Sequence, residues 1–305
     1  MREEHKEIRP EKAEPEETGL EENGLGKTKP EKVRPEKTGQ IGAVFLLCGI
    51  LAGCFAGSLF LPENASYMNL ADCNLPPCRK YPFGTDARGR DLFLMIWNGG
   101  RISLSIGFLS TVFSTAIAVV LGVFSGLSAK WVDGVLMWVT DILLIIPGLL
   151  LLFLWQGIFG KNTVTGLSFA IGSVSWMQMA KVIRTQVREL GKKDYILAAR
   201  AMGGGFFHIL RKHLTPDIVS SIMFMVVMNI RSAMMTEATL SFMGIGLSLE
   251  QISWGSMLSI AQRAFFTSSW WVIVIPGIFL VVTLCCITAI GNAFRREVNL
   301  RHSNL

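Results

Sequence analysis

Residues 181–217 read KVIRTQVRELGKKDYILAARAMGGGFFHILRKHLTPD, and this stretch decides the fold. It is a short basic segment with signals for the start and the end of a helix. Apolar runs with the character of membrane spans lie on both sides of it, at residues 162–180 and 217–236. We therefore expect a helix-containing loop that joins two spans of a membrane protein.

The helix within this loop has a definable start, face and end. Asp194 suits the N-cap position, because its carboxylate can accept hydrogen bonds from the free amides of the first turn. Residues at i, i+3, i+4 and i+7 form one apolar stripe, namely Tyr195, Ala198, Ala199 and Met202. Gly203 begins a glycine run that predicts the end of the helix.

The composition of this stripe favours a protein partner over lipid. The small alanines at its centre let another protein surface approach closely, whereas a helix lying on a lipid surface is expected to carry bulky Leu, Phe or Trp. Arg200 and the Arg211-Lys212 pair flank the stripe. On the cytoplasmic side of a membrane, such a helix points to a transporter subunit powered by a separate motor protein.

The chain as a whole has the composition of a membrane protein with a polar tail. Of its 305 residues, 50% are apolar and 17% are charged, against about 25% charged in soluble domains. Residues 1–40 differ, with 9 Lys and Arg and 11 Asp and Glu but almost no large apolar side chains. Such a segment cannot bury enough surface to offset its ordering entropy, so we expect a disordered cytoplasmic tail before a transmembrane domain at 41–305.

The sequence offers little support for nucleotide or nucleic-acid binding by this chain. Gly26-Lys27-Thr28 is a partial phosphate-loop pattern, but Glu21 stands where the first glycine of that pattern is required. The basic pI near 9.1 is explained by basic loops between spans without invoking nucleic acid. We therefore expect no cofactor on this chain, and no partner of the nucleic-acid class.

Six stretches are long and apolar enough for membrane spans, which need about 20 residues each. They lie at residues 41–61, 102–129, 134–160, 162–180, 217–236 and 270–294. Pro147 and Pro276 are expected to kink the third and the sixth. The predicted fold class is an all-α integral membrane protein with six transmembrane helices.

The distribution of basic residues predicts the orientation. With the N-terminus inside, the cytoplasmic loops and the C-terminal end hold 12 Lys and Arg residues, and the outer segments hold 7. Because positive charge is retained on the cytoplasmic side, both ends of the transmembrane domain are expected there.

Three ionisable residues lie within the predicted spans: Asp141, Arg231 and Glu237. Charged side chains in spans face the helix bundle or a water-filled path. For these three residues we favour ion pairs between helices or at interfaces over direct contact with substrate. Arg231 and Glu237 are six residues apart and do not share a helical face, so a mutual pair would need a break in the helix. After Glu237, Gly244 and Gly246 let the chain leave the helix and return near the membrane surface, which suits a pore-lining role.

The cysteines and other reactive side chains do not indicate an enzyme or a metal centre. Cys73 and Cys78 flank NLPP in a predicted outer loop, where a disulfide or two free thiols are favoured over a metal site because no histidine is near. No paired carboxylates, Ser/His/Asp set or zinc pattern supports catalysis. We expect neither a metal site nor a catalytic residue.

Several motifs resemble those of a known family. Ala198-Ala199, Gly203 and Leu214-Thr215-Pro216 look like the EAA loop of ABC-importer permeases, although Leu197 replaces the usual glutamate and Thr215 the usual leucine. In that family the loop forms a coupling helix that docks in a groove of the ATPase subunit. The resemblance implies ATPase-coupling residues at Asp194, Tyr195, Ala198, Ala199, Arg200, Met202, Gly203 and Pro216, within a coupling loop at 184–216.

Two further stretches narrow the resemblance. They resemble the second, C-type permease subunit of the dipeptide/oligopeptide/nickel importers. The first is FGTDARGRD at 83–91, followed by GRISL at 100–104, and the second is EATLSFMGIG at 237–246, followed by SWGSML at 253–258. The matches cover residues 81–296. In FGTDARGRD, charges of alternating sign and two glycines suit a self-paired structural elbow, with a site for substrate charge as the alternative.

The resemblance implies one half of a translocation pathway formed with a sister permease in a bacterial or archaeal cytoplasmic membrane. Two ATPase subunits, which would carry ATP and Mg, and an extracytoplasmic solute-binding protein are the implied partners. The implied cargo is peptides or nickel and other metal chelates. The alternatives are an ion-coupled carrier or channel, for which only Asp141 and Glu237 offer intramembrane carboxylates, and a membrane scaffold that transports nothing.

Overall fold

The computed structural model of this protein describes residues 37–60, 68–159, 163–194, 196, 202, 215–248, 251–262 and 269–303. All of these fall within the unit Lys37–Leu305, which is separate from residues 1–36. Most of the predicted tail at 1–40 therefore lies outside the described residues, and its last four residues are already helical.

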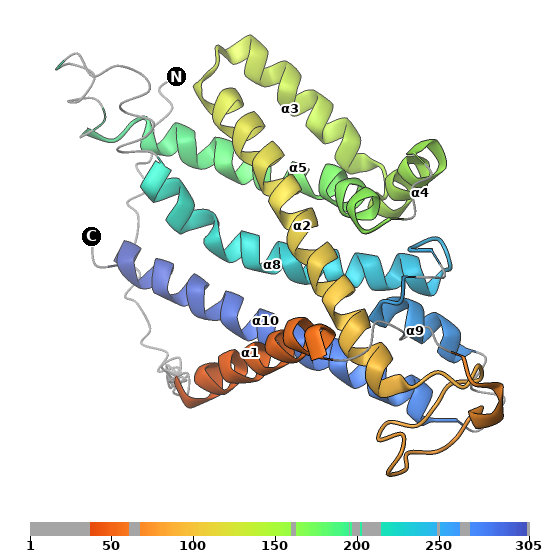
Figure 1. The fold of residues 1–305 in the computed structure, drawn as a ribbon. Coiled ribbons are helices and arrows are strands. Elements are labelled where there is room, and N and C mark those ends of the chain that lie inside the picture. The colour runs from red at the N-terminus through yellow and green to blue at the C-terminus, as the bar shows by residue number, and fades with distance from the viewer. Residues whose placement is uncertain are drawn as a thin grey trace, which may run out of the picture. The chain divides into compact units, whose positions relative to one another are not determined.

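Within the described residues the regular structure is helical, apart from one isolated β-bridge between Thr85 and Asp91. The α-helices are α1 (Lys37–Phe60), α2 (Leu92–Leu127), α3 (Lys130–Ile145), α4 (Gly148–Phe159), α5 (Val164–Leu190), α8 (Thr215–Phe242), α9 (Trp254–Ala261) and α10 (Trp271–Ser303). A short 3₁₀ helix, Leu70–Asp72, lies between α1 and α2. Figure 1 shows their arrangement.

Helix α2 is the centre of the bundle. It contacts α5 most extensively and also packs against α1 and α8, and Figure 1 shows it crossing α5 and α8. The buried side chains of α2 that face these neighbours are mostly small, including Gly107, Ser110, Ser114, Ala118 and Gly122. Small residues let helix backbones approach closely. The resulting van der Waals packing holds helices together in lipid, where the hydrophobic effect between them is weak.

The number of helices that qualify as membrane spans is smaller than six when judged by length and hydropathy. Among the described residues α1, α2 and α10 qualify, and the bent pair α3 and α4 makes a fourth if it is one span. Helices α5 and α8 are long enough, at 27 and 28 residues, but they carry more polar side chains.

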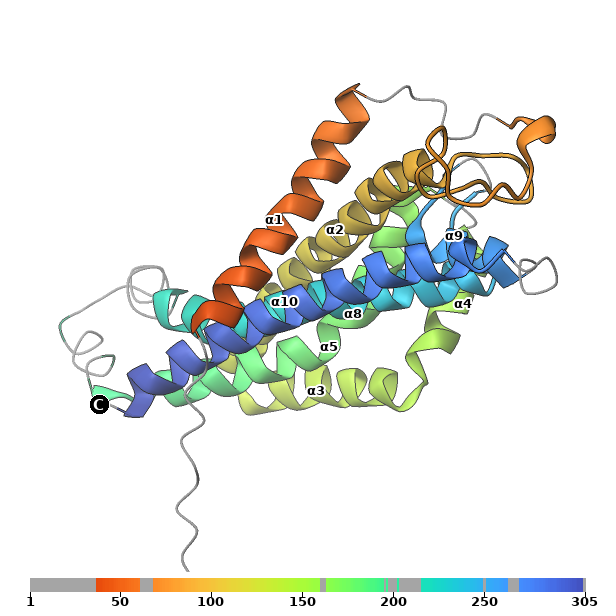
Figure 2. The same cartoon turned by 90° about the horizontal axis from the view of Figure 1, so that it is seen from below.

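The span predicted over 134–160 is not one continuous helix. Helix α3 ends at Ile145, α4 begins at Gly148, and the two are bent by 93°. Ile146 is extended, at φ −74° and ψ 127°, as expected for a residue that precedes proline. Figure 2 shows α3 turning sharply into α4. Pro147 therefore breaks the helix instead of kinking it, whereas α10 continues unbroken through Pro276.

Other boundaries also differ from the predicted ones. Helix α2 begins ten residues before position 102, because the Asp91 carboxylate caps it by accepting from the Phe93 amide at 2.8 Å. Helix α5 continues to Leu190, so residues 184–190 of the predicted coupling loop are still part of a long helix. Helix α8 continues to Phe242.

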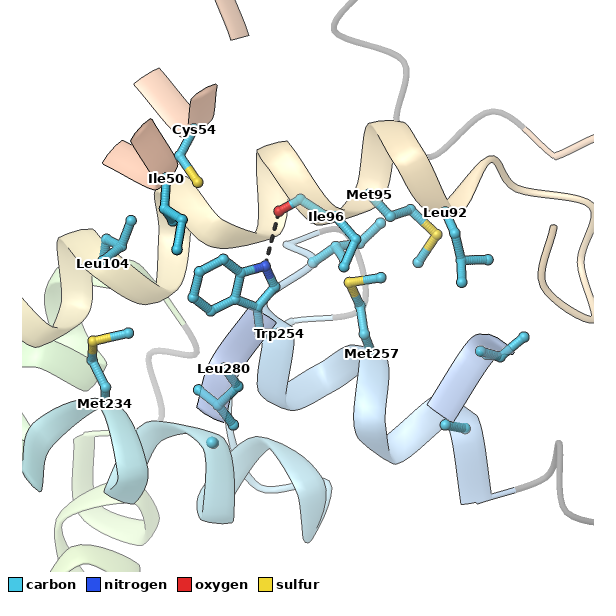
Figure 3. Close-up of a cluster of buried hydrophobic side chains, with 14 of the residues drawn as sticks. Ile50, Cys54, Leu92, Met95, Ile96, Leu104, Met234, Trp254, Met257 and Leu280 are labelled. Carbon is cyan, nitrogen blue, oxygen red and sulfur yellow. Dashed lines mark hydrogen bonds between the residues drawn. The ribbon is translucent and has the colours of Figure 1, made fainter. Parts of the chain in front are cut away.

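The largest apolar core surrounds Trp254, which is fully buried at the start of α9. Its indole Nε1 donates to the Ile96 carbonyl of α2 at 2.9 Å, and Figure 3 shows this bond together with the residues around it. Met234 of α8 and Leu280 of α10 belong to the same cluster. Ile50 and Cys54 of α1 belong to it as well, so helices α1, α2, α8 and α10 pack around one aromatic side chain of α9, which fixes α9 against the bundle.

Candidate functional site

The predicted coupling segment is only partly described. Asp194 is exposed, Met202 is 82% exposed, and Pro216 lies in the first turn of α8. The predicted coupling residues Tyr195, Ala198, Ala199, Arg200 and Gly203 lie outside the described residues. Proline suits the first turn of a helix because the amide it lacks has no partner there. The described ends of the segment are thus α5 on one side and α8 on the other.

The end of α5 that leads into this segment is held by an ionic cluster. Asp133, in the first turn of α3, is buried with 4% of its surface exposed. Its carboxylate accepts from Arg184 Nε and, at 2.5 Å, from Arg184 Nη2. Arg188 Nη2 lies 2.8 Å from the second carboxylate oxygen, and Ser125 Oγ of α2 donates at 2.6 Å. We call Ser125, Asp133, Arg184 and Arg188 the Asp133 cluster.

This cluster joins three helices at one point. Ser125 belongs to α2, Asp133 to α3, and the two arginines lie one turn apart in α5. A carboxylate in the first turn of a helix is favoured by the free amides and the helix dipole. Two guanidinium groups and a hydroxyl satisfy the remaining oxygen lone pairs, which offsets the cost of burying the charge. The last turns of α5 are therefore tied to α2 and α3 by this cluster.

Asp141 forms a second ionic contact between α3 and α5. It contacts Lys181 of α5, but the two side chains are 55% and 39% exposed. An exposed ion pair contributes about 0–1 kcal/mol. The observed contact of Asp141 is thus interhelical, and it is much weaker than that of the Asp133 cluster.

Glu237 lies in a fully buried polar centre. Its carboxyl group accepts from Ser103 Oγ of α2 at 3.1 Å, from Ser241 Oγ of α8 at 2.8 Å and from Ser253 Oγ at 2.6 Å. Ser253 is also the N-cap of α9. A buried carboxyl group needs such donors, because leaving it without hydrogen bonds costs several kcal/mol. Glu237 therefore ties α2, α8 and α9 together.

Arg231 and Glu237 are not paired with each other by any observed contact. Within the described part of the chain, the buried Nε atom of Arg231 has no hydrogen-bond partner. Beyond Glu237, α8 ends at Phe242 and Gly244 adopts a positive φ of 80°. Gly246 is buried against Ser241. The chain thus leaves α8 at these glycines before it reaches α9.

The FGTDARGRD segment is internally paired. Arg90 Nε donates to Asp86 Oδ2 at 2.8 Å, and both side chains are almost fully buried. The other oxygen of Asp86 accepts from the Arg88 and Arg90 amides, both at 2.9 Å. Gly84 and Gly89 have φ values of 78° and 69°, which favour glycine. The charges of Asp86 and Arg90 thus pair with each other inside the elbow, as expected for a self-paired structural element.

Sequence reasoning missed the Asp133 cluster and the three serines around Glu237. Arg184 and Arg188 are among the 12 basic residues that predict the cytoplasmic side, and that count does not show that they share a partner. Their spacing of one turn, together with an aspartate directly before the span predicted at 134–160, is a usable signal. Ser241 lies one turn after Glu237 in the same helix, which is a local signal, whereas Ser103 and Ser253 lie 134 and 16 residues away in sequence and give none.

Apolar helices, buried ionic and polar ties between them, and a basic segment joining α5 to α8 define a multi-pass membrane protein of the transport class. Residues 118–299 match the family described as "Binding-protein-dependent transport system inner membrane component". The chain belongs to this family.

Relatives of known name agree with this assignment. The chain is 32% identical over 256 residues to the oligopeptide transport system permease protein OppC of Bacillus subtilis (strain 168), covering 84% of this chain and 83% of that protein. It is 29% identical over 252 residues to the dipeptide transport system permease protein DppC of the same organism, covering 83% of this chain and 78% of that protein.

The fold agrees with that of a solved importer. A chain of the MetNI methionine ABC transporter, in an inward-facing conformation, matches with a TM-score of 0.56 at 18% identity, covering 67% of this chain and 96% of that chain. This likeness concerns the fold alone. The family and the relatives, which are named as permease proteins, identify this protein as a permease subunit of an ABC importer.

Proposed function

We propose that this permease subunit imports peptides across the cytoplasmic membrane of a bacterium or archaeon. The observation that carries this cargo is the 32% identity to an oligopeptide permease over 83% of that protein's length. Nickel or another metal chelate is the alternative cargo in the wider family. The ion-coupled carrier has less support, because both of its required carboxylates make contacts within the bundle, Asp141 with Lys181 and Glu237 with three serines.

The proposed topology has six crossings with both ends of the transmembrane domain in the cytoplasm. The crossings are α1, α2, the broken pair α3 and α4, α5, α8 and α10. A sister permease supplies the other half of the pathway, and two ATPase subunits bind ATP and Mg below the membrane. An extracytoplasmic solute-binding protein delivers the peptide. In this topology the Asp133 cluster lies near the cytoplasmic face.

The proposed mechanism is alternating access driven by the coupling segment. ATP-dependent closure of the ATPase subunits moves the helix at 194–207. This motion enters the membrane domain through Leu190 at the end of α5 and through Pro216 at the start of α8. Because the Asp133 cluster joins the last turns of α5 to α2 and α3, these helices move with α5. Without this tie, the end of α5 would bend locally and transmit less of the motion.

Reconstitution tests the proposal. The complete complex, with the sister permease, both ATPases and the binding protein, is placed in liposomes and given a radiolabelled tripeptide or a nickel chelate. The proposal predicts peptide uptake that requires ATP and is unaffected by collapse of the proton and sodium gradients. Uptake driven by an ion gradient without ATP would refute the ATP-coupled mechanism, and uptake of the chelate without peptide would refute the cargo.

A further inference from the structure

A cavity of about 310 Å³ lies where α3 breaks into α4. Pro147 lies at the break, and α5 and α8 form the opposite walls. Gln178, which lines the cavity, is near the middle of the 27-residue α5. At 1.5 Å per residue this places it about 20 Å from either end of the helix, deep within the proposed membrane layer.

The cavity is lined by polar side chains that do not ionise. These are Ser175 and Gln178 of α5 and Asn229 and Ser232 of α8, and the remaining described residues of the lining are apolar or glycine. Ser175 Oγ donates to the Ile171 carbonyl, and Asn229 Nδ2 donates to Ser114 Oγ at 2.6 Å. Gln178 and Ser232 are exposed, and neither side chain makes a hydrogen bond within the described part of the chain.

The polar lining continues along α8 as a stripe. Asn229, Ser232, Thr236 and Thr239 follow one another at spacings of three, four and three residues, which places them on one face. The exposed residues of α2 contrast with this stripe, because Phe108, Val120 and Phe124 are apolar and 60%, 67% and 57% exposed. The exposed apolar side chains of α2 suit lipid, whereas the polar stripe of α8 does not.

Unpaired amide and hydroxyl groups at this depth need water or a polar partner. Hydrocarbon offers no hydrogen bonds, so each such group facing lipid would cost several kcal/mol. Two sources can satisfy Gln178 and Ser232, namely the sister permease or a wet path with a passing substrate. The cavity favours the second, because a void at the helix break leaves room for a molecule that moves.

We propose that this cavity is the substrate-binding part of the pathway contributed by this subunit, and that it holds peptides by neutral hydrogen bonds to their backbone. This inference rests on the proposed peptide import. A glutamine side chain both donates and accepts, as does each backbone amide unit. Since no lining side chain ionises, the cavity does not select for or against charge on the peptide's own side chains.

Crosslinking in the complete complex tests the location. The photoreactive residue p-benzoylphenylalanine replaces Gln178 in one variant and Val120, on the apolar face of α2, in the control. With a radiolabelled tripeptide, binding protein and ATP, we expect peptide crosslinks at position 178 and none at 120. Suppose that the wild-type complex takes up peptide but the variant crosslinks from position 178 only to the sister permease or to lipid. That result would overturn the inference about the cavity and leave the proposed function intact. A wild-type complex that takes up no peptide refutes the proposed function itself.

Transport measurements test the chemical class. Gln178→Leu removes the amide at similar volume, and we expect it to lower uptake of acidic, neutral and basic tripeptides by a similar factor, about two- to tenfold for one lost hydrogen bond. Gln178→Asn, which keeps an amide, should restore part of the loss for all three peptides. A loss confined to one charge class, or no loss in Gln178→Leu, would contradict backbone recognition.

Discussion

The substitution Asp133→Asn should release the end of α5 from its neighbours. Removing one partner of a buried ion pair costs about 3–5 kcal/mol. Arg184 and Arg188 have side chains that are 25% and 36% exposed, so water compensates part of this cost, and we expect about 3 kcal/mol. At 1.4 kcal/mol per factor of ten, the open fraction of the last turns of α5 rises about 100-fold.

Hydrogen exchange measures this opening directly. Amides of residues 184–190 should exchange about 100-fold faster in Asp133→Asn, because local opening limits their exchange. Asp141→Asn is the matched control, since Asp141 also joins α3 to α5 but through an exposed pair. It should change the exchange of the same amides by less than about fivefold. Equal effects of the two substitutions, or no effect of Asp133→Asn, would refute the assignment of the anchor.

Three further predictions concern the buried polar groups and the outer loop. Glu237→Ala should lower the free energy of unfolding by about 3 kcal/mol, because several buried hydroxyls lose their acceptor. Glu237→Gln should recover part of this lost free energy. Thermal unfolding in detergent measures both variants. Asp86→Ala and Arg90→Ala should each cost about 3–5 kcal/mol, and the double variant should cost less than their sum, as a double-mutant cycle would show. The hydrogen bond from the Tyr81 hydroxyl lowers the pKa of Asp72 below its ordinary value of 3.8. Its folded-state pKa is depressed, so the stabilisation is present above 3.8 and is lost as the pH falls through the lower folded value, and Tyr81→Phe should move the pKa back toward 3.8 in a carboxyl NMR titration.

Local features of this protein were predictable from its sequence. The elbow is one example, because Asp86 and Arg90 are four residues apart and the glycines that permit the turns lie between and beside them. The departure of the chain from α8 near Gly244 is another. In both cases the residues that determine the structure are neighbours in sequence, so the pattern can be read without knowing the fold.

Features that depend on packing were not predictable in the same way. Asp133 and Arg184 are 51 residues apart, and their contact follows from the packing of α3 on α5. Pro147 predicted a kink, but the 93° bend reflects how α4 packs against α5. The start of α2 at Leu92 follows from the Asp91 cap, and Asp91 lies in the polar elbow before the span predicted at 102–129.

We propose that the helix at 194–207 receives the motion of a separate ATPase, and co-purification tests this coupling most directly. Ala199→Glu places a bulky charge at the centre of the small apolar stripe. We expect this variant to insert in the membrane at the wild-type level but no longer to retain the ATPase subunits. Retention of the ATPases by Ala199→Glu at the wild-type level would contradict it.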